Sequence, residues 1–169
     1  YPVLGCLSEA SRFAAEGYKF INTIYRIDGQ AERLDLFEGL GLSDSDLATF
    51  IHPTAYYAPN AVFEPGVVLM PYVMISAGAR LGRGSLIMVG ASIGHNTELG
   101  AYNHVAAQAV VGAYIKTGTG VHIGLNATLR ENLTIGDHAT LGMGAVLTKN
   151  VGEKEIWAGN PAKFLRMVK

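Results

Sequence analysis

Two of the five histidines, His95 and His104, lie nine residues apart in the stretch IGHNTELGAYNHVAAQA, residues 93–109. An imidazole titrates near neutral pH, so a histidine can act as a general base and remove a proton from a nucleophile. Two histidines share such a task only if the fold brings them together. Whether these two side chains act together therefore depends on where the fold places residues that are nine positions apart.

The segment from Ile51 to Gly152 is a six-residue repeat without any insertion. It contains 17 hexads, and 16 of them begin with an apolar residue, the exception being Thr117. Glycine occupies the second position in eight of them. A period of six suits a short strand and a tight turn, with one large side chain pointing inward and a small residue at the corner. Such regular repetition overrides a segment-by-segment assignment and predicts a parallel β-helix, with three hexads in each triangular coil.

In such a fold, residues 18 apart stack in columns, because successive coils lie about 4.8 Å apart. Nine residues are half of a coil, so we expect His95 and His104 on opposite sides of the prism, unable to form a dyad within one chain. His122 lies one coil above His104 and could be its neighbour in a purely structural column. Ala113 lies one coil above His95.

Charged residues are unevenly distributed along the chain. Residues 1–50 contain 12 Asp, Glu, Lys or Arg, whereas residues 51–152 contain only 9. This drop predicts a boundary near residue 50 and indicates that the coil covers much of its surface against another molecule. The formal net charge of −1 gives no sign of a nucleic-acid partner. No uncharged apolar run reaches the roughly 18 residues of a membrane span.

The ends of the chain carry weaker signals. The first residue is Tyr rather than Met, so we expect the natural start to lie upstream, and no secretory signal is visible. The single cysteine, Cys6, excludes an internal disulfide and fits a reducing compartment such as the cytoplasm. We expect Cys6 to be a buried structural thiol rather than a nucleophile.

Residues 1–50 are expected to form a helix, a strand and a second helix. Ser8 is expected to cap a first helix that ends at Gly17, KFINTIY reads as a strand, and QAERLDLFEGLG as an amphipathic helix closed by glycine. This order is typical of the tail of an α/β unit. At the other end, EKEIWAGNPAKFLRMVK is expected to close the coil with a turn at residues 159–161 and a basic tail.

The uninterrupted hexads, the H-x8-H spacing and the ending GMGAVLTKNV…WAGNPAKF resemble those of the left-handed β-helix acyltransferases. The chain is most similar to bacterial sugar acetyltransferases of the sialic-acid O-acetyltransferase and nucleotide-linked aminosugar N-acetyltransferase type. The segments YPVLG, YKFINTIY and FIHPTA look like the second half of that family's N-terminal Rossmann-like domain and its junction with the coil. The resemblance implies that residues 1–50 are the C-terminal remainder of a nucleotide-sugar-binding domain. Residues 51–169 would be a left-handed β-helix acyltransferase domain with a C-terminal tail.

The resemblance also implies roles for individual residues. It places the family's catalytic histidine at His95 and a histidine that contacts acetyl-CoA at His104. Leu125 and Met143 match further acetyl-CoA contacts of the family, on the same side of the coil as His104. The backbone N–H of Ala113 is the candidate oxyanion donor to the thioester carbonyl.

The sequence departs from the family pattern beside His95. The family often has an acidic residue where Asn96 stands, and an amide can accept a hydrogen bond from the imidazole but cannot stabilise its charged form as a carboxylate does. Asn96 is therefore the candidate orienting residue, with Glu98 as a possible alternative carboxylate. His52 and His138 match no motif, and both read as ordinary surface residues.

We therefore expect an acetyl-CoA-dependent sugar N-acetyltransferase that acts on the amino group of a nucleotide-linked amino-dideoxysugar. His95 would be the general base of a direct transfer that needs no metal. The resemblance implies a cytoplasmic homotrimer of cell-surface polysaccharide biosynthesis, with acetyl-CoA held between subunits. In that groove the His95 side of one subunit would meet the His104 side of its neighbour.

Two alternatives remain open at this stage. One is a sugar O-acetyltransferase of the same fold. The other is a zinc-dependent β-helix carbonic anhydrase, which needs three histidine ligands. That family has two of the ligands five residues apart, and this spacing is absent from the sequence.

Overall fold

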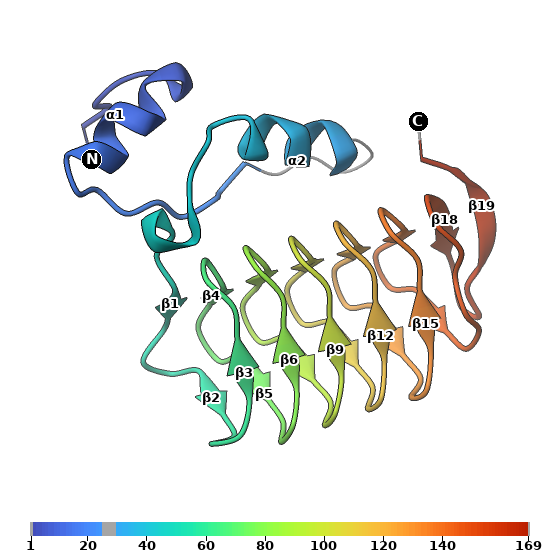
Figure 1. Ribbon diagram of the computed structural model, residues 1–169. Helices are drawn as coiled ribbons and strands as arrows, with labels where there is room; N and C mark the ends of the chain where they lie inside the picture. Colours follow the sequence, from blue (N-terminus) through green and yellow to red (C-terminus); the bar gives the residue numbers. More distant parts are fainter. Residues whose placement is uncertain (1, 25–29, 169) are drawn as a thin grey trace.

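The computed structural model describes residues 2–24 and 30–168, and a coil of short parallel strands dominates it (Figure 1). Two-residue strands follow one another every six residues, from β1 (Phe50–Ile51) to β17 (Val146–Leu147). They form three sheets, each of which collects every third strand. The predicted left-handed parallel β-helix is confirmed, and its first strand begins at Phe50.

The three sheets are named here in the order in which the chain reaches them. The first sheet contains β1, β4 (Val68–Leu69), β7 (Leu86–Ile87), β10 (His104–Val105), β13 (His122–Ile123), β16 (Thr140–Leu141), β18 (Glu155–Ala158) and β19 (Lys163–Met167). The second contains β2 (Tyr56–Tyr57), β5 (Met74–Ile75), β8 (Ser92–Ile93), β11 (Val110–Val111), β14 (Thr128–Leu129) and β17. The third contains β3 (Val62–Phe63), β6 (Arg80–Leu81), β9 (Glu98–Leu99), β12 (Lys116–Thr117) and β15 (Thr134–Ile135).

The core of the coil is built from two positions of each hexad. First-position residues such as Ile87, Val105 and Ile123 are fully buried, as predicted. Fifth-position residues such as Ala109 and Val121 are also fully buried, so most hexads place two side chains in the core, whereas the first-position Tyr57 is 44% exposed. Full burial of each Ile, Leu or Val side chain stabilises the folded state by about 1.5–3 kcal/mol, and this contribution recurs in every coil.

Thr117, the one polar first position, is half-buried and takes part in a polar network. Its hydroxyl donates to Asn103 Oδ1 over 2.8 Å and accepts the Gly100 N–H over 3.1 Å. Asn103 in turn donates to the Gly118 carbonyl over 2.8 Å. Because these groups satisfy one another, the break in the apolar pattern leaves the register of the coil unchanged.

The corners of the coil require two special backbone features. Residues at the fourth position, from Gly66 to Gly144, all have positive φ, including Asn96 at 56° and Tyr114 at 56°. The second-position glycines allow close stacking of successive coils. A Cβ atom on Gly82 would lie 2.5 Å from the carbonyl carbon of Gly100.

The N-terminal residues form two helices and two short 3₁₀ turns. These are η1 (Leu7–Glu9), α1 (Ala10–Ala15), α2 (Gln30–Glu38) and η2 (Asp44–Asp46). The second predicted helix is confirmed as α2, and a turn with Gly17 at φ 89° ends the first helical segment, as predicted. No helix within residues 2–24 and 30–168 is long and apolar enough to cross a membrane.

Three local predictions at this end are wrong. Ser8 lies inside η1 instead of capping it, because the Glu9 carboxylate accepts the Cys6 N–H over 3.0 Å and starts the turn earlier. Cys6 is exposed rather than buried, since η1 lies at the surface. Residues 19–24 form no strand and contribute only an isolated bridge between Phe20 and Leu47, while Tyr25 lies outside the described residues.

The N-terminal segment packs along the coil at the corner between the third and first sheets (Figure 1). Leu34 and Phe37 of α2 are buried in one apolar cluster with Tyr102 of the coil. Arg83 of the coil donates to Glu38 Oε1 and Asp44 Oδ1, each over 2.6 Å. These contacts attach α2 and η2 to a fixed part of the coil.

The C-terminal residues cap the last coil. Strands β18 and β19 pair in antiparallel orientation around a turn at residues 159–162, so the predicted turn is confirmed. The expected basic tail is part of the sheet, since Lys163 and Arg166 belong to the exposed strand β19.

The close stacking at the corners gives a prediction about stability. Gly82→Ala should lower the free energy of unfolding by about 3 kcal/mol, because the new Cβ atom would overlap the backbone of the next coil. The matched control is Gly144→Ala, where φ is +66° but no atom lies within 4 Å, so the loss should be about 1 kcal/mol. Chemical denaturation of both variants measures the difference. Equal losses would contradict this role of the corner glycines.

Candidate functional site

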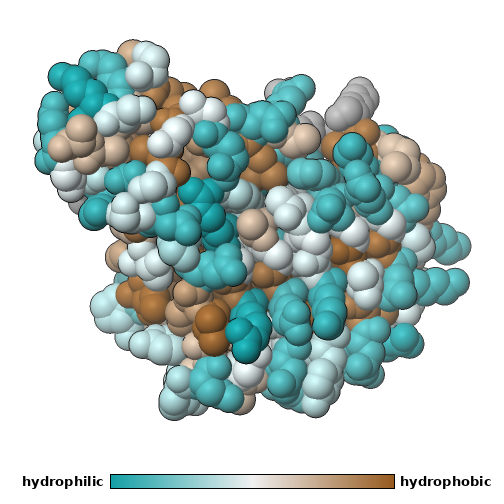
Figure 2. All heavy atoms as spheres, viewed as in Figure 1, coloured by the Kyte–Doolittle hydropathy of each residue, from teal (hydrophilic) through white to brown (hydrophobic). Residues whose placement is uncertain are grey.

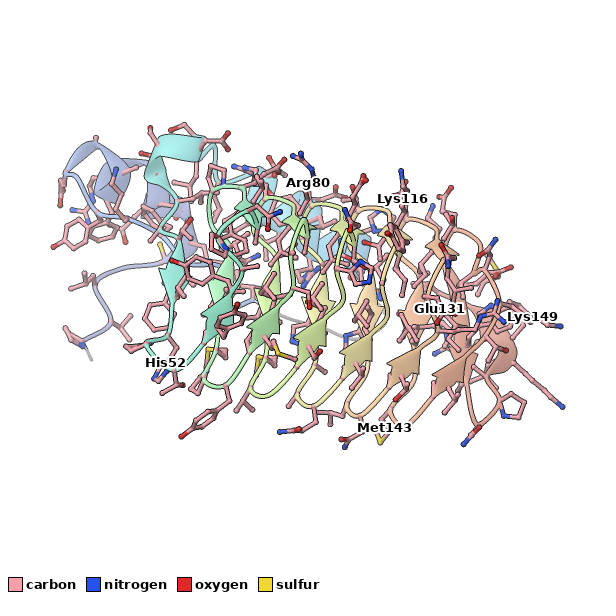
Figure 3. The ribbon with its side chains drawn as sticks, turned by 90° about the horizontal axis from the view of Figure 1, so that it is seen from below. His52, Arg80, Lys116, Glu131, Met143 and Lys149 are labelled. Atoms are coloured by element: carbon pink, nitrogen blue, oxygen red, sulfur yellow. The ribbon has the colours of Figure 1, made fainter. Side chains whose placement is uncertain are left out.

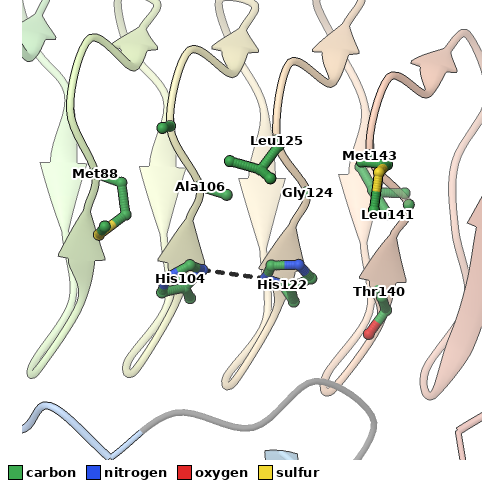
Figure 4. Close-up of a pocket in the computed structure, with 11 residues that line it drawn as sticks. Met88, His104, Ala106, His122, Gly124, Leu125, Thr140, Leu141 and Met143 are labelled. Atoms are coloured by element: carbon green, nitrogen blue, oxygen red, sulfur yellow. Dashed lines mark hydrogen bonds between the residues drawn. The ribbon is translucent and has the colours of Figure 1, made fainter.

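An apolar groove of about 320 Å³ crosses the first sheet beside His104 (Figure 4). Three of the residues proposed from the sequence, His104, Leu125 and Met143, line it together. Leu125 and Met143 are 47% and 75% exposed, so the groove offers uncovered apolar surface. The remaining lining residues are Met88, Ala106, Ala107, His122, Gly124, Thr140, Leu141 and Gly142.

The sequence predicts only part of this groove. All of its lining residues except Leu141 belong to three columns with an 18-residue spacing, which pass through His104, Ala106 and Ala107. Extending the 18-residue rule to all three columns would have predicted Thr140 and Gly124 as lining residues. The groove is therefore a consequence of register, with small residues at the corner leaving room beside larger ones.

His104 and His122 lie side by side at the buried end of the groove. Their Nδ1 atoms are 3.1 Å apart, and the two side chains belong to residues that are 8% and 5% exposed (Figure 4). Loss of solvation on burial is the largest cause, and together with the nearby His122 and Arg33 it lowers the pKa of His104 to about 3. Burial and Arg33 lower the pKa of His122 to about 4. Both rings are neutral at pH 7, so one Nδ1 donates to the other.

Helix α2 lies against the same end of the groove. The side-chain amide of Gln30 donates a hydrogen bond to Thr140 Oγ1, and Gln30 is fully buried. Arg33 donates to the Tyr102 carbonyl over 3.1 Å. One wall of the groove is thus linked to the N-terminal segment.

His95 lies on a different face, at the corner between the second and third sheets, where it follows β8 and is exposed. Its Nδ1 is 3.1 Å from Asn96 Oδ1. An amide oxygen only accepts, so Nδ1 carries the proton and Nε2 keeps the lone pair that a base needs. The Tyr114 ring stands edge-on to the imidazole, with centroids 5.0 Å apart.

The local backbone suits an asparagine next to His95. Asn96 occupies a fourth position with φ 56°, and asparagine tolerates this left-handed conformation better than a β-branched residue does. Tyr114 occupies the same position one coil above. Sequence reasoning missed Tyr114, although the 18-residue rule places it directly above Asn96.

Ala113 lies one coil above His95, as expected. The neighbouring Tyr114 N–H donates to the His95 carbonyl over 3.0 Å, which fixes the two corners relative to each other. Within the described part of the chain the Ala113 N–H donates no hydrogen bond, so it can reach a ligand. The same holds for Leu125 and Met143, whereas the N–H groups of two other third positions, Arg83 and Thr119, donate to the Glu64 and Asp137 carboxylates.

The structure separates the two histidines as the half-coil spacing predicts. His104 belongs to the first sheet and His95 to the corner after the second, and His95 is not among the residues that line the groove. The two predicted halves of the site, His95 with Asn96 and Ala113, and His104 with Leu125 and Met143, therefore occupy different faces of one chain.

Other side chains considered from the sequence have local partners. Glu98, the alternative carboxylate, forms an ion pair of 3.6 Å with Lys116, and the hydrogen-bonding partner of His95 is Asn96. His52 Nδ1 lies 2.9 Å from the Thr54 hydroxyl. His138 is half-buried rather than an ordinary surface residue, because it stacks over Gly120. Residues 2–24 and 30–168 contain no group of three or more potential metal ligands.

Comparison with known proteins gives matches by structure. No family model matches the chain, and no curated protein matches its sequence. A mutant of perosamine N-acetyltransferase from Caulobacter crescentus, in complex with CoA and GDP-perosamine, is similar with a TM-score of 0.86 and 25% identity, over 98% of this chain and 78% of that chain. The acetyltransferase domain of PglB from Neisseria gonorrhoeae, in complex with acetyl coenzyme A, is similar with a TM-score of 0.86 and 28% identity, over 98% and 79%.

A further match covers a smaller part of the chain. Serine acetyltransferase from Neisseria gonorrhoeae is similar with a TM-score of 0.56 and 30% identity, over 58% of this chain and 41% of that chain. The two sugar acetyltransferases match almost the whole chain, N-terminal segment included. The resemblance to left-handed β-helix sugar acetyltransferases is thereby confirmed.

The buried histidine pair gives a prediction about stability and pH. The unfolded chain takes up protons on His104 and His122 near pH 6.5, whereas the folded chain does so only near the lowered pKa values of about 3 and about 4. The contribution of these two neutral histidines to the free energy of unfolding is therefore complete above pH 6.5 and decreases as the pH falls below that value. At pH 5 each of the two histidines should lower the free energy of unfolding by about 2 kcal/mol relative to its value above pH 6.5.

Denaturation at pH 7.5 and at pH 5 measures this effect. The double variant His104→Asn, His122→Asn should lose most of the pH dependence, whereas the control His52→Asn should keep it. A free energy of unfolding that stays constant over this range in the parent protein would mean that the pair takes up protons in the folded state.

Proposed function

We propose that the protein is an acetyl-CoA-dependent sugar N-acetyltransferase, which moves an acetyl group to the amino group of a nucleotide-linked amino-dideoxysugar. One observation carries the proposal: the near-complete structural likeness, over 98% of the chain, to enzymes crystallised with CoA and GDP-perosamine or with acetyl-CoA. An acceptor screen with acetyl-CoA tests it, with GDP-perosamine as the first acceptor and free CoA as the readout. Release of CoA with a sugar hydroxyl, and none with an aminosugar, would favour the O-acetyltransferase alternative.

The apolar groove on the first sheet is the proposed site of the acetyl-CoA arm. His104, Leu125 and Met143 line its wall, and a flexible apolar chain can lie along such a column of exposed side chains. A neutral His104 suits this role, because a charged imidazole would cost solvation energy beside an apolar chain. The free N–H of Ala113 is the proposed donor to the thioester oxygen.

His95 is the proposed general base. Asn96 holds Nδ1, so Nε2 can accept a proton as the sugar amine attacks the thioester carbonyl. The carbon–sulfur bond then breaks and CoA leaves with the electron pair, in a direct transfer without an acyl-enzyme. The lone cysteine, Cys6, lies outside the coil and takes no part.

A homotrimer is proposed because the two halves of the site lie on different faces of one chain. In a closed ring the His95 corner of one subunit can meet the apolar groove of the next. Exposed apolar side chains on the second sheet support such an assembly, with Tyr56, Met74 and Val110 exposed by 61%, 49% and 46%. Faces of this kind are commonly covered in an oligomer.

The N-terminal segment is proposed to belong to the nucleotide-sugar part of the enzyme. Residues 1–50 would be the C-terminal remainder of a Rossmann-like domain, and residues 51–169 the acyltransferase domain. The packing of α2 against Tyr102 and Arg83 supports a fixed position of this segment beside the coil. We further propose a cytoplasmic role in the biosynthesis of a cell-surface polysaccharide.

The role of His95 gives the first kinetic prediction. His95→Ala should lower kcat by a factor on the order of 10²–10⁴ and leave the KM for acetyl-CoA nearly unchanged, because the base acts only as the amine attacks. His52→Ala is the control and should keep full activity. Retained turnover in His95→Ala would remove this residue from the mechanism.

The assembly gives a second kinetic prediction. His95→Ala lacks the base and Met143→Trp fills the groove, so each homotrimer should be nearly inactive. In a mixed ring one of the three interfaces combines an intact His95 with an intact groove. Equal random mixing gives about three-quarters mixed trimers, so roughly a quarter of the parent activity should return.

Refolding the two variants together and measuring activity tests this assembly. If one of the two variants carries a mass label, mass spectrometry of the same sample confirms that trimers containing both variants have formed. If the mixture stays as inactive as its components despite exchange, the site shared between subunits is wrong.

A further inference from the structure

A second cavity, polar rather than apolar, lies on the third sheet. It has a volume of about 600 Å³, and Asn60, Arg80, Asn96, Glu98, Tyr114 and Lys116 line it. Figure 2 shows hydrophilic side chains gathered over this face, and Figure 3 shows Arg80 and Lys116 on the opposite side of the coil from Met143. The cavity is therefore separate from the groove proposed for acetyl-CoA.

This polar cavity adjoins His95. Asn96, whose Oδ1 lies 3.1 Å from His95 Nδ1, forms part of its wall. Tyr114, whose ring stands edge-on to the imidazole, forms another part. A molecule held in the cavity can thus present a group to His95 across these two residues.

The charges of the cavity form a ladder along three successive coils. Glu98 stands between Arg80 and Lys116, since β9 pairs with β6 on one side and with β12 on the other. Glu98 pairs with Lys116 over 3.6 Å, and both side chains are more than half exposed, so the pair contributes little to stability. Within the described residues Arg80 forms no ion pair and no side-chain hydrogen bond, although Glu98 is its register partner.

The balance of charge favours an anionic ligand. Two cations and one carboxylate leave the cavity with a net positive charge, and a guanidinium without a partner can bind phosphate oxygens with two parallel hydrogen bonds. A further carboxylate next to β3, that of Glu64, accepts the Arg83 backbone N–H over 2.8 Å. A positive cavity repels the ammonium form of an aminosugar, so the amine would lie outside it, towards His95.

We propose, on the basis of the proposed function, that this polar cavity binds the diphosphate of the nucleotide-linked acceptor. Arg80 and Lys116 bind the diphosphate oxygens, and Glu98 exchanges its contact with Lys116 for solvent. The sugar then extends past Tyr114 and Asn96 and brings its amine to His95 Nε2. Arg80 and Lys116 are thus specificity residues for an acceptor that carries a diphosphate.

Charge-neutralising substitutions test the proposal in opposite directions. Arg80→Gln and Lys116→Gln should each raise the KM for GDP-perosamine roughly tenfold to a hundredfold, with the KM for acetyl-CoA and kcat nearly unchanged. Glu98→Gln should lower the KM for GDP-perosamine, because it removes a negative charge from the cavity. Lys149→Gln is the matched control at the far end of the coil and should change neither KM (Figure 3).

A binding measurement separates failure of this proposal from failure of the proposed function. Calorimetry with GDP and with inorganic pyrophosphate should detect binding to the parent trimer and at least tenfold weaker binding to Arg80→Gln. If the parent binds them but transfers no acetyl group to any aminosugar, the proposed function fails and the cavity assignment stands. An unchanged KM and unchanged binding in Arg80→Gln, or a raised KM in Glu98→Gln, would overturn the cavity assignment.

Discussion

The stacking of inward side chains at 18-residue intervals determines the rest of this structure. Ile87, Val105, Ile123 and Leu141 form one such column, and each is fully buried. A shift of one residue would turn every inward side chain outward, so the core fixes the register of the whole coil. The register of the core therefore also determines which outward-facing residues are neighbours. His104 must lie beside His122, and Glu98 must lie between Arg80 and Lys116.

The same constraint separates the chemistry onto different faces. The apolar groove runs over the first sheet, and the polar cavity lies on the third, with His95 at the corner beside it. A thioester arm and a charged acceptor need such different surroundings, because apolar surface favours one and fixed charge the other. A rigid prism cannot fold these faces together. In the proposed trimer, assembly brings them into contact, and the geometry of each face is already set by the coil of a single subunit.

The sequence predicted what depends on periodicity and failed where structure depends on local partners. The coil, its 18-residue columns and the opposite placement of His95 and His104 follow from one repeat. The start of the first helix depended on the Glu9 carboxylate, and the predicted strand at residues 19–24 has only Leu47 as a pairing partner within the described residues. Tyr114 was missed for a different reason. The 18-residue rule places Tyr114 one coil above Asn96, but the direction of its ring, edge-on to the His95 imidazole, depends on the side-chain conformation and not on the repeat.

Helix α2 connects regions of the coil that the register alone would leave independent. At one end Gln30 reaches Thr140, which lines the apolar groove, and at the other Glu38 accepts from Arg83 and from the Tyr102 hydroxyl. Its buried side chains pack against the same tyrosine. A segment held at both ends against a rigid coil has little freedom to move independently of it. The N-terminal segment therefore sets the position of one wall of the groove, and any nucleotide-binding part attached to it would stand in a fixed relation to the coil.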